Sequence, residues 1–392
     1  MSRDISTTGS RRLARRLAAL GSTAVATVAF GGVGLQPASA VDAPVHALFL
    51  QTNDPAGNAI KSFKQNADGS LTPAGIYMTG GNGGTQEGAV ADPLASQGGL
   101  TYDPEHHLLF AVNEGSDTFT VFAVHGTVLE RRQVLGADGH LPSSISVQDN
   151  LVYVLDAGGN GAITGFRIER SNRVVKIRNT TRSLGLGNPA TPNFLKSPSQ
   201  VLISPDLRTV VVATKSNGVL DVFRLRHGVP SAAPVVNASA APVPFALLFD
   251  DLNRLLVTEA SGSESSYKVR HNGELQLISG PVVNGQKAGC WSVIAKGFVY
   301  VANSGSNTIT GYAEDWHGRL TLLNANGVTA TTDAAPVDLV ASADGRFLYQ
   351  HAAVAGVVDE FAVNDDGSLT RIGTLTGLTP TNMTGPEGIA AS

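Results

Sequence analysis

The sequence predicts an all-β protein of seven similar units, because one pattern recurs seven times along its 392 residues. In each unit an aromatic residue precedes an aliphatic one by seven or eight positions, and a turn separates them. Turn dipeptides such as Asp68-Gly69 and Asn272-Gly273 favour the positive φ angles of a two-residue hairpin. Only the fourth pair has proline in the aliphatic place. The pairs are Phe63/Leu71, Phe122/Leu129, Phe166/Val174, Phe223/Pro230, Tyr267/Leu275, Tyr312/Leu320 and Phe361/Leu369.

The spacing between units predicts a seven-bladed β-propeller of four-stranded blades. The aromatic residues recur every 44 to 59 positions, and each unit contains a hairpin. The second unit is typical, with strands expected at 99–103, 108–113, 118–124 and 131–135. The second strand of each unit is a continuous apolar run, as expected where neighbouring blades bury both faces. These runs are 48–50, 109–112, 152–155, 210–213, 255–258, 299–302 and 347–350.

The first unit lacks an innermost strand, because its predicted strands begin directly at residues 45–50. Residues 388–392 follow the seventh unit and can supply the missing strand beside the first blade. This closure would remove the free sheet edges that otherwise promote aggregation. We therefore expect the C-terminal strand to join the first blade and close the ring.

The first forty residues have the features of a signal peptide. The apolar segment 17–35 is followed by a small-residue cleavage site, Ala38-Ser39-Ala40. A membrane anchor is the alternative, but the segment is rich in Ala and Gly and the cleavage site follows at once. We expect 1–40 to be removed, 41–392 to form the propeller domain, and the mature protein to be secreted or periplasmic. No later segment is apolar enough to span a bilayer. The basic region directly ahead of the apolar segment consists of Arg11, Arg12, Arg15 and Arg16.

Charge and cysteine content exclude several classes of partner and of stabilisation. The signal carries five Arg and one Asp, which leaves 23 basic and 31 acidic residues and a formal charge near −8. This balance argues against nucleic acid or an anionic membrane as a partner. Cys290 is the only cysteine, so no intramolecular disulfide can form. We expect a monomer that is stabilised by its sheets and by ring closure.

The candidate site is the channel mouth on the face that we call the top. Two kinds of loop are expected on this face: the loops that follow the fourth strands and the loops between second and third strands. Two insertions, 79–97 and 184–199, lengthen loops on the same face. Residues that end second strands or begin innermost strands would ring the mouth. The candidate catalytic residues are Glu259, His351, Glu387 and Lys215. The candidate ligand-binding residues are Gln97, Asn113, Asp156, Gln200, Trp291 and Asn303.

Carboxylates crowded in a narrow mouth have raised pKa values or bind a cation, and either property supports acid–base chemistry. The alternative is that these residues cap strand ends and bond to exposed backbone. Trp291 suits either stacking on a ring-shaped ligand or packing in the core. We expect no cofactor and assign no metal ligands, although carboxylate and amide oxygens of this kind would suit Ca²⁺.

Four segments resemble the repeats of the seven-bladed lactonase family, which includes propeller-type 6-phosphogluconolactonases and carboxymuconate-lactonizing enzymes. They are residues 68–73 (DGSLTP), 203–208 (ISPDLR), 300–307 (YVANSGSN) and 342–349 (SADGRFLY). The resemblance covers residues 45–392 and implies the propeller fold and lactone chemistry. The export signal points to an exported bacterial branch.

The chain departs from this family where the innermost strands begin. The family typically has histidine there, whereas the corresponding residues of this chain include none. The family's catalytic residues therefore cannot be transferred by position. The segments are Ser96-Gln97-Gly98, Ser197-Pro198-Ser199-Gln200, Val243-Pro244-Phe245, Gly289-Cys290-Trp291 and Ala335-Pro336-Val337.

The sequence leaves two functions open. The first is an exported lactone hydrolase or lactonizing cyclase, acting on an unphosphorylated sugar acid or related carboxylic acid. Attack of water on a lactone needs a base, here Glu259, Glu387 or His351, and an oxyanion donor. The donor would be Lys215, Gln97 or Asn303. The second function is a non-catalytic extracytoplasmic scaffold that binds a sugar, peptide or protein.

Overall fold

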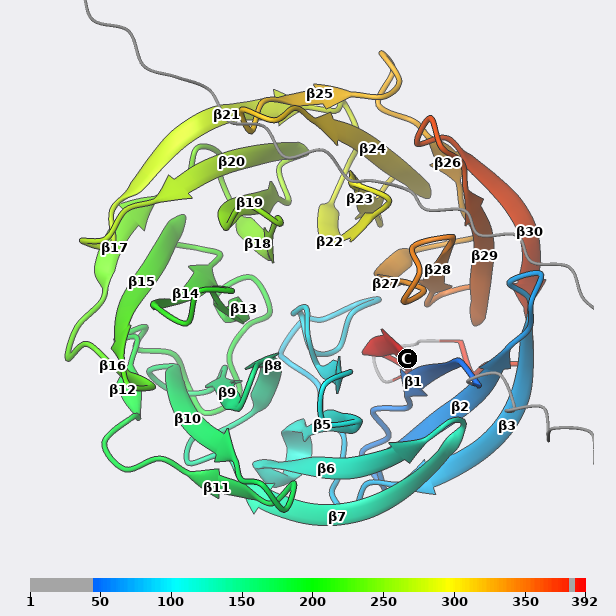
Figure 1. The fold of residues 1–392 in the computed structure, drawn as a ribbon. Helices are drawn as coiled ribbons and strands as arrows, with labels where there is room; N and C mark the ends of the chain where they lie inside the picture. Colours follow the sequence, from blue (N-terminus) through cyan, green and yellow to red (C-terminus); the bar gives the residue numbers. More distant parts are fainter. Residues whose placement is uncertain (1–44, 381–384) are drawn as a thin grey trace, which may run out of the picture. The chain divides into compact units, whose positions relative to one another are not determined.

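The computed structural model describes residues 45–380 and 385–392. Seven antiparallel sheets, each of four or five strands, stand around a central axis and form a seven-bladed propeller (Figure 1). The predicted fold class is therefore confirmed. The predicted signal peptide, residues 1–40, lies outside the described residues. Within the described residues, no helix is long and apolar enough to cross a membrane.

The two inner strands of each blade are close to the predicted positions. The innermost strands are β31 (Ile389–Ala391), β4 (Leu100–Asp103), β8 (Pro142–Gln148), β13 (Pro198–Ile203), β18 (Pro244–Phe249), β22 (Gly289–Ala295) and β27 (Pro336–Ala341). The second strands are β1 (Ala47–Gln51), β5 (Leu108–Asn113), β9 (Leu151–Asp156), β14 (Thr209–Thr214), β19 (Arg254–Glu259), β23 (Phe298–Asn303) and β28 (Phe347–Ala352). All seven second strands are almost completely buried between blades, which explains their continuous apolar sequences.

The two outer strands of each blade carry the hairpins. The third strands are β2 (Ala59–Gln65), β6 (Thr118–His125), β10 (Ala162–Ile168), β15 (Val219–Arg226), β20 (Ser263–Val269), β24 (Thr308–Glu314) and β29 (Val357–Val363). The outermost strands are β3 (Leu71–Met78), β7 (Val128–Gly136), β11 (Val174–Lys176), β16 (Val229–Pro230), β21 (Leu275–Val283), β25 (Leu320–Leu322) and β30 (Leu369–Leu375). Three blades add a short second outer segment, namely β12 (Arg182–Ser183), β17 (Val235–Ala238) and β26 (Ala330–Thr331). One 3-10 turn, Glu114–Ser116, follows β5.

The C-terminal strand closes the ring as predicted. Strand β31 pairs with β1 in antiparallel register, with Leu48 opposite Ala391 and Leu50 opposite Ile389. Two further backbone hydrogen bonds join Gln51 to Gly388 and Glu387. The first blade is thus assembled from both ends of the domain.

Several hairpin turns differ from the predicted two-residue type. At Asp68-Gly69 only the glycine has a positive φ, 87°, and the loop between the paired Asn66 and Ser70 has three residues. The Asp68 carboxylate accepts a hydrogen bond from the Ser70 backbone N–H (3.0 Å), so this residue forms an Asx turn and stays out of the left-handed region. The His227-Gly228 turn has positive φ at both residues and is the predicted two-residue hairpin.

Candidate functional site at the closed end of the channel

The top mouth of the channel is not open, because the insertion at residues 79–97 folds into it. Leu94 and Ala95 are buried at the centre of the ring, and Leu94 joins the apolar core of the second and third blades. Figure 1 shows part of the light-blue segment between β3 and β5 in the middle of the ring. The second insertion contacts the first, since Glu87 and Asn193 form an isolated β-bridge. The hydrophobic effect favours this closure, because it removes the side chains of Leu94 and Ala95 from water.

Three of the predicted site residues converge on this loop from three different blades, and a fourth lies at its end. Trp291 Nε1 donates to the Ser96 carbonyl (3.0 Å), and Lys215 Nζ donates to the Ala95 carbonyl (2.5 Å). The Glu387 carboxylate accepts from the Leu94 N–H (2.9 Å). These contacts hold the loop in place.

Gln97, the fourth residue, ends the loop and spans the channel. Its side-chain amide donates to the Ser292 carbonyl (3.0 Å) and accepts from the Ser292 N–H (2.9 Å). This pair joins the second blade to the sixth. It therefore forms part of the floor on which the channel ends.

The residues behind the loop form a buried charged cluster. Lys215 Nζ lies 5.3 Å from the centroid of the Phe245 ring, and that ring meets Trp291 edge-on at 5.1 Å. Burial lowers the pKa of Lys215 to about 8. Burial and the adjacent Asp92 carboxyl raise the pKa of Glu387 well above its usual range. Burial also raises the pKa of Glu114 to about 8. The cluster consequently retains protons near neutral pH.

Below the loop, a cavity of about 280 Å³ occupies the channel and is lined by all seven innermost strands. Exposure rises along the channel away from the loop. Gln200 and Asp338 are buried, whereas Leu202 and Val340, two residues further along the same strands, are half-buried. The cavity therefore opens on the bottom face.

Asp338 is the one ionisable side chain with a strongly shifted pKa in the wall of this cavity, among the described residues. It is 5% exposed and has a φ of 51°, a left-handed conformation that is strained for a residue with a Cβ. Its carboxylate accepts from the N–H groups of Leu339 (3.0 Å) and Ile389 (3.1 Å). Burial nevertheless raises its pKa to about 7. Such a carboxyl can act as an acid or a base at neutral pH.

Two other polar residues complete the closed end. Gln200 accepts from the Leu247 N–H (2.6 Å) and donates to the Leu247 carbonyl (3.1 Å), which joins the fourth blade to the fifth. The buried Ser292 hydroxyl has no hydrogen-bond partner within the described structure.

Three of the remaining predicted residues are bonded to side chains in or beside their own blades. Glu259 accepts from Ser263 Oγ (2.8 Å) and Ser239 Oγ (3.3 Å). Asn113 donates to Thr118 and Thr120, and Asn303 makes the equivalent bonds to Thr308 and Thr310. The same arrangement in two blades indicates a structural role: an Asn at the end of the second strand bonds to two Thr hydroxyls of the third strand and fixes the strand end.

Asp156 and His351 are also fully buried. The two ring nitrogens of His351 have no hydrogen-bond partners within the described residues. Burial raises the pKa of Asp156 well above its usual range, and burial lowers the pKa of His351 to about 3. Neither residue lines the channel cavity.

Asp338, Ser292 and Asp92 are not among the residues predicted from the sequence. The signal that could have indicated the first two is their place in innermost strands, since Asp338 follows Pro336-Val337 and Ser292 follows Trp291. Within the described residues, no three His, Cys, Asp or Glu side chains are placed to hold a metal ion. The carboxyls around Glu387 therefore do not fit a Ca²⁺ site built from three such ligands.

Comparison with known proteins decides the family. A family model described as lactonase, 7-bladed beta-propeller, matches residues 100–384. The chain belongs to this lactonase family. A search of curated proteins finds no match. Solved structures similar to this lactonase-family propeller share 15–16% identity with it, which supports the fold alone.

Three of these structures cover most of both chains. A putative 6-phosphogluconolactonase from Bacteroides fragilis has a TM-score of 0.66, 15% identity, and coverage of 91% of this chain and 100% of its own. A putative 6-phosphogluconolactonase from Bacteroides uniformis has a TM-score of 0.68, 15% identity, and coverage of 89% of this chain and 99% of its own. The periplasmic gluconolactonase of Pseudomonas aeruginosa has a TM-score of 0.65, 16% identity, and coverage of 86% and 98%.

Proposed function

We propose that this lactonase-family propeller hydrolyses the lactone of an unphosphorylated sugar acid, or of a related carboxylic acid, outside the cytoplasm. The observation that carries the proposal is Asp338, a buried carboxyl with a pKa of about 7 in the wall of the channel cavity. Family membership favours this activity over a non-catalytic scaffold.

The proposed reaction uses the closed end of the cavity. Ionised Asp338 takes a proton from water as the water attacks the lactone carbonyl, and a neighbouring donor stabilises the developing oxyanion. When the tetrahedral intermediate collapses, the ring C–O bond breaks and protonated Asp338 returns the proton to the leaving ring oxygen, which becomes the hydroxyl of the open acid. The Gln97 amide, which lines the cavity and also bonds to the Ser292 carbonyl, is the donor at this end, and the Ser292 hydroxyl is buried behind it. Glu387 and Lys215 act as positioning residues, because they hold the loop that ends in Gln97.

The cavity wall supports an unphosphorylated substrate. Among the described residues lining the cavity there is no Lys, Arg or His, and Asp338 is the acidic one. A phosphate group would bring two negative charges beside this carboxyl with no cation to balance them. A volume of about 280 Å³ suits one sugar ring. The signal-like residues 1–40 support export, and the Pseudomonas aeruginosa neighbour is itself described as a periplasmic gluconolactonase.

Replacement of Asp338 tests the proposal. D338N is expected to lower kcat/KM on D-glucono-1,5-lactone by about 100-fold or more, because a general base contributes that much to the rate. In the wild type, kcat/KM should rise as pH increases through about 7, when Asp338 ionises. Proton release is followed in a pH-stat and corrected for spontaneous hydrolysis.

The control is D251N, at an exposed turn residue outside the cavity, which should retain wild-type activity. Thermal unfolding establishes that D338N is folded. Full activity in folded D338N would exclude Asp338 as the base. No turnover by the wild type on gluconolactone or a panel of related lactones would instead favour the binding scaffold.

A further inference from the structure

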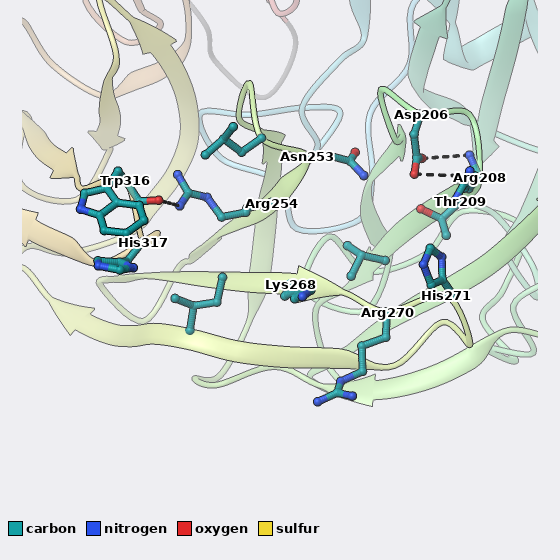
Figure 2. Close-up of a pocket in the computed structure, with 13 residues that line it drawn as sticks. Asp206, Arg208, Thr209, Asn253, Arg254, Lys268, Arg270, His271, Trp316 and His317 are labelled. Carbon is teal, nitrogen blue, oxygen red and sulfur yellow. Dashed lines mark hydrogen bonds and ion pairs between the residues drawn. The ribbon is translucent and has the colours of Figure 1, made fainter. Parts of the chain in front are cut away.

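A basic groove lies outside the channel, across the fourth, fifth and sixth blades. It consists of two adjoining hollows of about 510 and 670 Å³ that share Arg208 and His271. Figure 2 shows Trp316 and His317 at one end of the first hollow, Arg208 and His271 at the other, and Lys268 between them. None of the lining residues also lines the channel cavity. The groove is a separate feature of the molecule.

The groove concentrates positive charge on a protein whose net charge is negative. Six cationic side chains line the two hollows, together with His271 and His317, and Asp206 is the one acidic residue among the described lining residues. The six are Arg208, Arg224, Arg226, Arg254, Lys268 and Arg270. Because the chain without its signal has a formal charge near −8, this grouping is not a consequence of overall composition.

The strand register explains how the cations come together. Arg224 and Arg226 are two residues apart on β15, so they lie on one face of their blade, and Lys268 and Arg270 have the same spacing at the end of β20. All four side chains are exposed. Within the described residues, none of them forms an ion pair, so their charges remain available to a ligand.

The other two arginines differ from these. Arg254 is held by Asp250 (2.5 Å) and Glu314 (3.1 Å) and donates to the Trp316 carbonyl (3.0 Å), so it fixes the position of the turn that carries the tryptophan. Arg208 lies 3.9 Å from Asp206, and both are exposed, so this pair is weak and can be exchanged for another anion.

Trp316 supplies a second type of contact. Its indole is 76% exposed, an unusual position for the largest apolar side chain, and it is anchored by Arg254 at the end of the groove. A flat exposed aromatic ring packs against the apolar face of a sugar ring, and arginine pairs with carboxylates in bidentate geometry. The combination fits a ligand with both sugar rings and carboxylates.

We infer that this groove binds a segment of an acidic polysaccharide, with a sugar ring on Trp316 and carboxylates on Lys268, Arg208 and Arg226. The inference does not depend on the proposed lactone hydrolysis. It gives the protein a polymer-binding surface in addition to the small cavity of the channel.

Binding of oligogalacturonate to the full propeller domain tests the inference. The wild type should bind it at low salt and bind the fully methyl-esterified form, which has the same sugar chain without charge, at least about tenfold more weakly. The R226A/K268A variant should lose at least about tenfold in affinity for oligogalacturonate. W316A should weaken the binding of both forms, because stacking does not require charge. Affinity is measured by isothermal titration calorimetry at several salt concentrations.

The matched control is R167A/R170A, which removes two exposed arginines of the third blade and changes the net charge equally. It should bind as the wild type does. If both double variants lost affinity for oligogalacturonate equally, the effect would be one of net charge, and the assignment of the binding site to the groove would be wrong. Equal binding of the esterified form would exclude carboxylate recognition. Tighter binding of inorganic polyphosphate would assign the groove to a phosphate polymer instead. Thermal unfolding verifies that each variant is folded.

Discussion

Deletion of residues 385–392 is expected to destabilise the whole propeller by more than about 5 kcal/mol. Such a change removes strand β31, exposes the edge of β1 and takes away the buried side chains of Ile389 and Ala390. It also removes the Ile389 N–H that is bonded to Asp338 and the Glu387 carboxylate that holds the loop. Unfolding followed by circular dichroism should show a midpoint lower by about 10 °C or more.

A milder variant provides the comparison for this deletion. I389V keeps the strand and removes one methylene, so it should cost only about 0.5–1.5 kcal/mol. A synthetic peptide of residues 385–392 added to the truncated protein should restore part of the lost stability by pairing with β1. A truncated protein that unfolds as the wild type does would contradict the role assigned to β31.

The second large effect concerns pH, because most of the shifted buried carboxyls have raised pKa values. Burial raises the pKa of Asp338 from 3.8 to about 7 and that of Glu114 from 4.5 to about 8. Between these values the folded state holds a proton that the unfolded state has released, so stability falls as pH rises. For Asp338 alone, complete ionisation lowers the free energy of unfolding by about 4 kcal/mol relative to the fully protonated state. His351 has the opposite effect, because burial lowers its pKa from 6.5 to about 3. Between these values the unfolded state binds one proton that the folded state does not, so this residue makes stability rise with pH.

The protein is therefore expected to be several kcal/mol more stable at pH 5 than at pH 7.5. Below about pH 4 the trend reverses as exposed carboxylates such as Asp344, with a pKa of about 2, lose their ion pairs. Guanidinium unfolding at pH 5, 6 and 7.5 measures the change. D338N, which cannot titrate, should show a shallower dependence, and D251N should match the wild type. A stability that is constant or increases from pH 5 to 7.5 would contradict the assigned pKa values.

The blades were predictable because their information is local. A strand buried on both faces must be apolar throughout, and a tight turn requires particular residues. The seven apolar strands and their hairpins can therefore be identified from short segments of sequence. The closing strand was predictable by counting, since the first unit was short of one strand and residues 388–392 remained. The turn at Asp68-Gly69 was less accurate, because an Asx hydrogen bond competes with the two-residue geometry.

The site was predictable only in part. The rule that polar residues gather where strands begin or end selected Glu387, Lys215, Gln97 and Trp291, and in the structure these four lie in or against the same loop. The same rule selected Asn113 and Asn303, whose amides bond to neighbouring threonines. Polar side chains at strand ends commonly make structural hydrogen bonds of this kind. Residue type and position alone therefore do not distinguish a structural side chain from a ligand-binding one.

By itself the sequence determined the seven blades, the strand that closes the ring and the resemblance to the lactonase family, because repeats and apolar runs record local burial. Only the tertiary structure decided that residues 79–97 close the top mouth, that the channel opens at the bottom, and that Asp338 lines its cavity. These features depend on contacts between residues about 120 to 290 positions apart, such as Lys215 with Ala95 and Glu387 with Leu94. The burial that shifts the pKa of Asp338 exists only once all seven blades surround the channel.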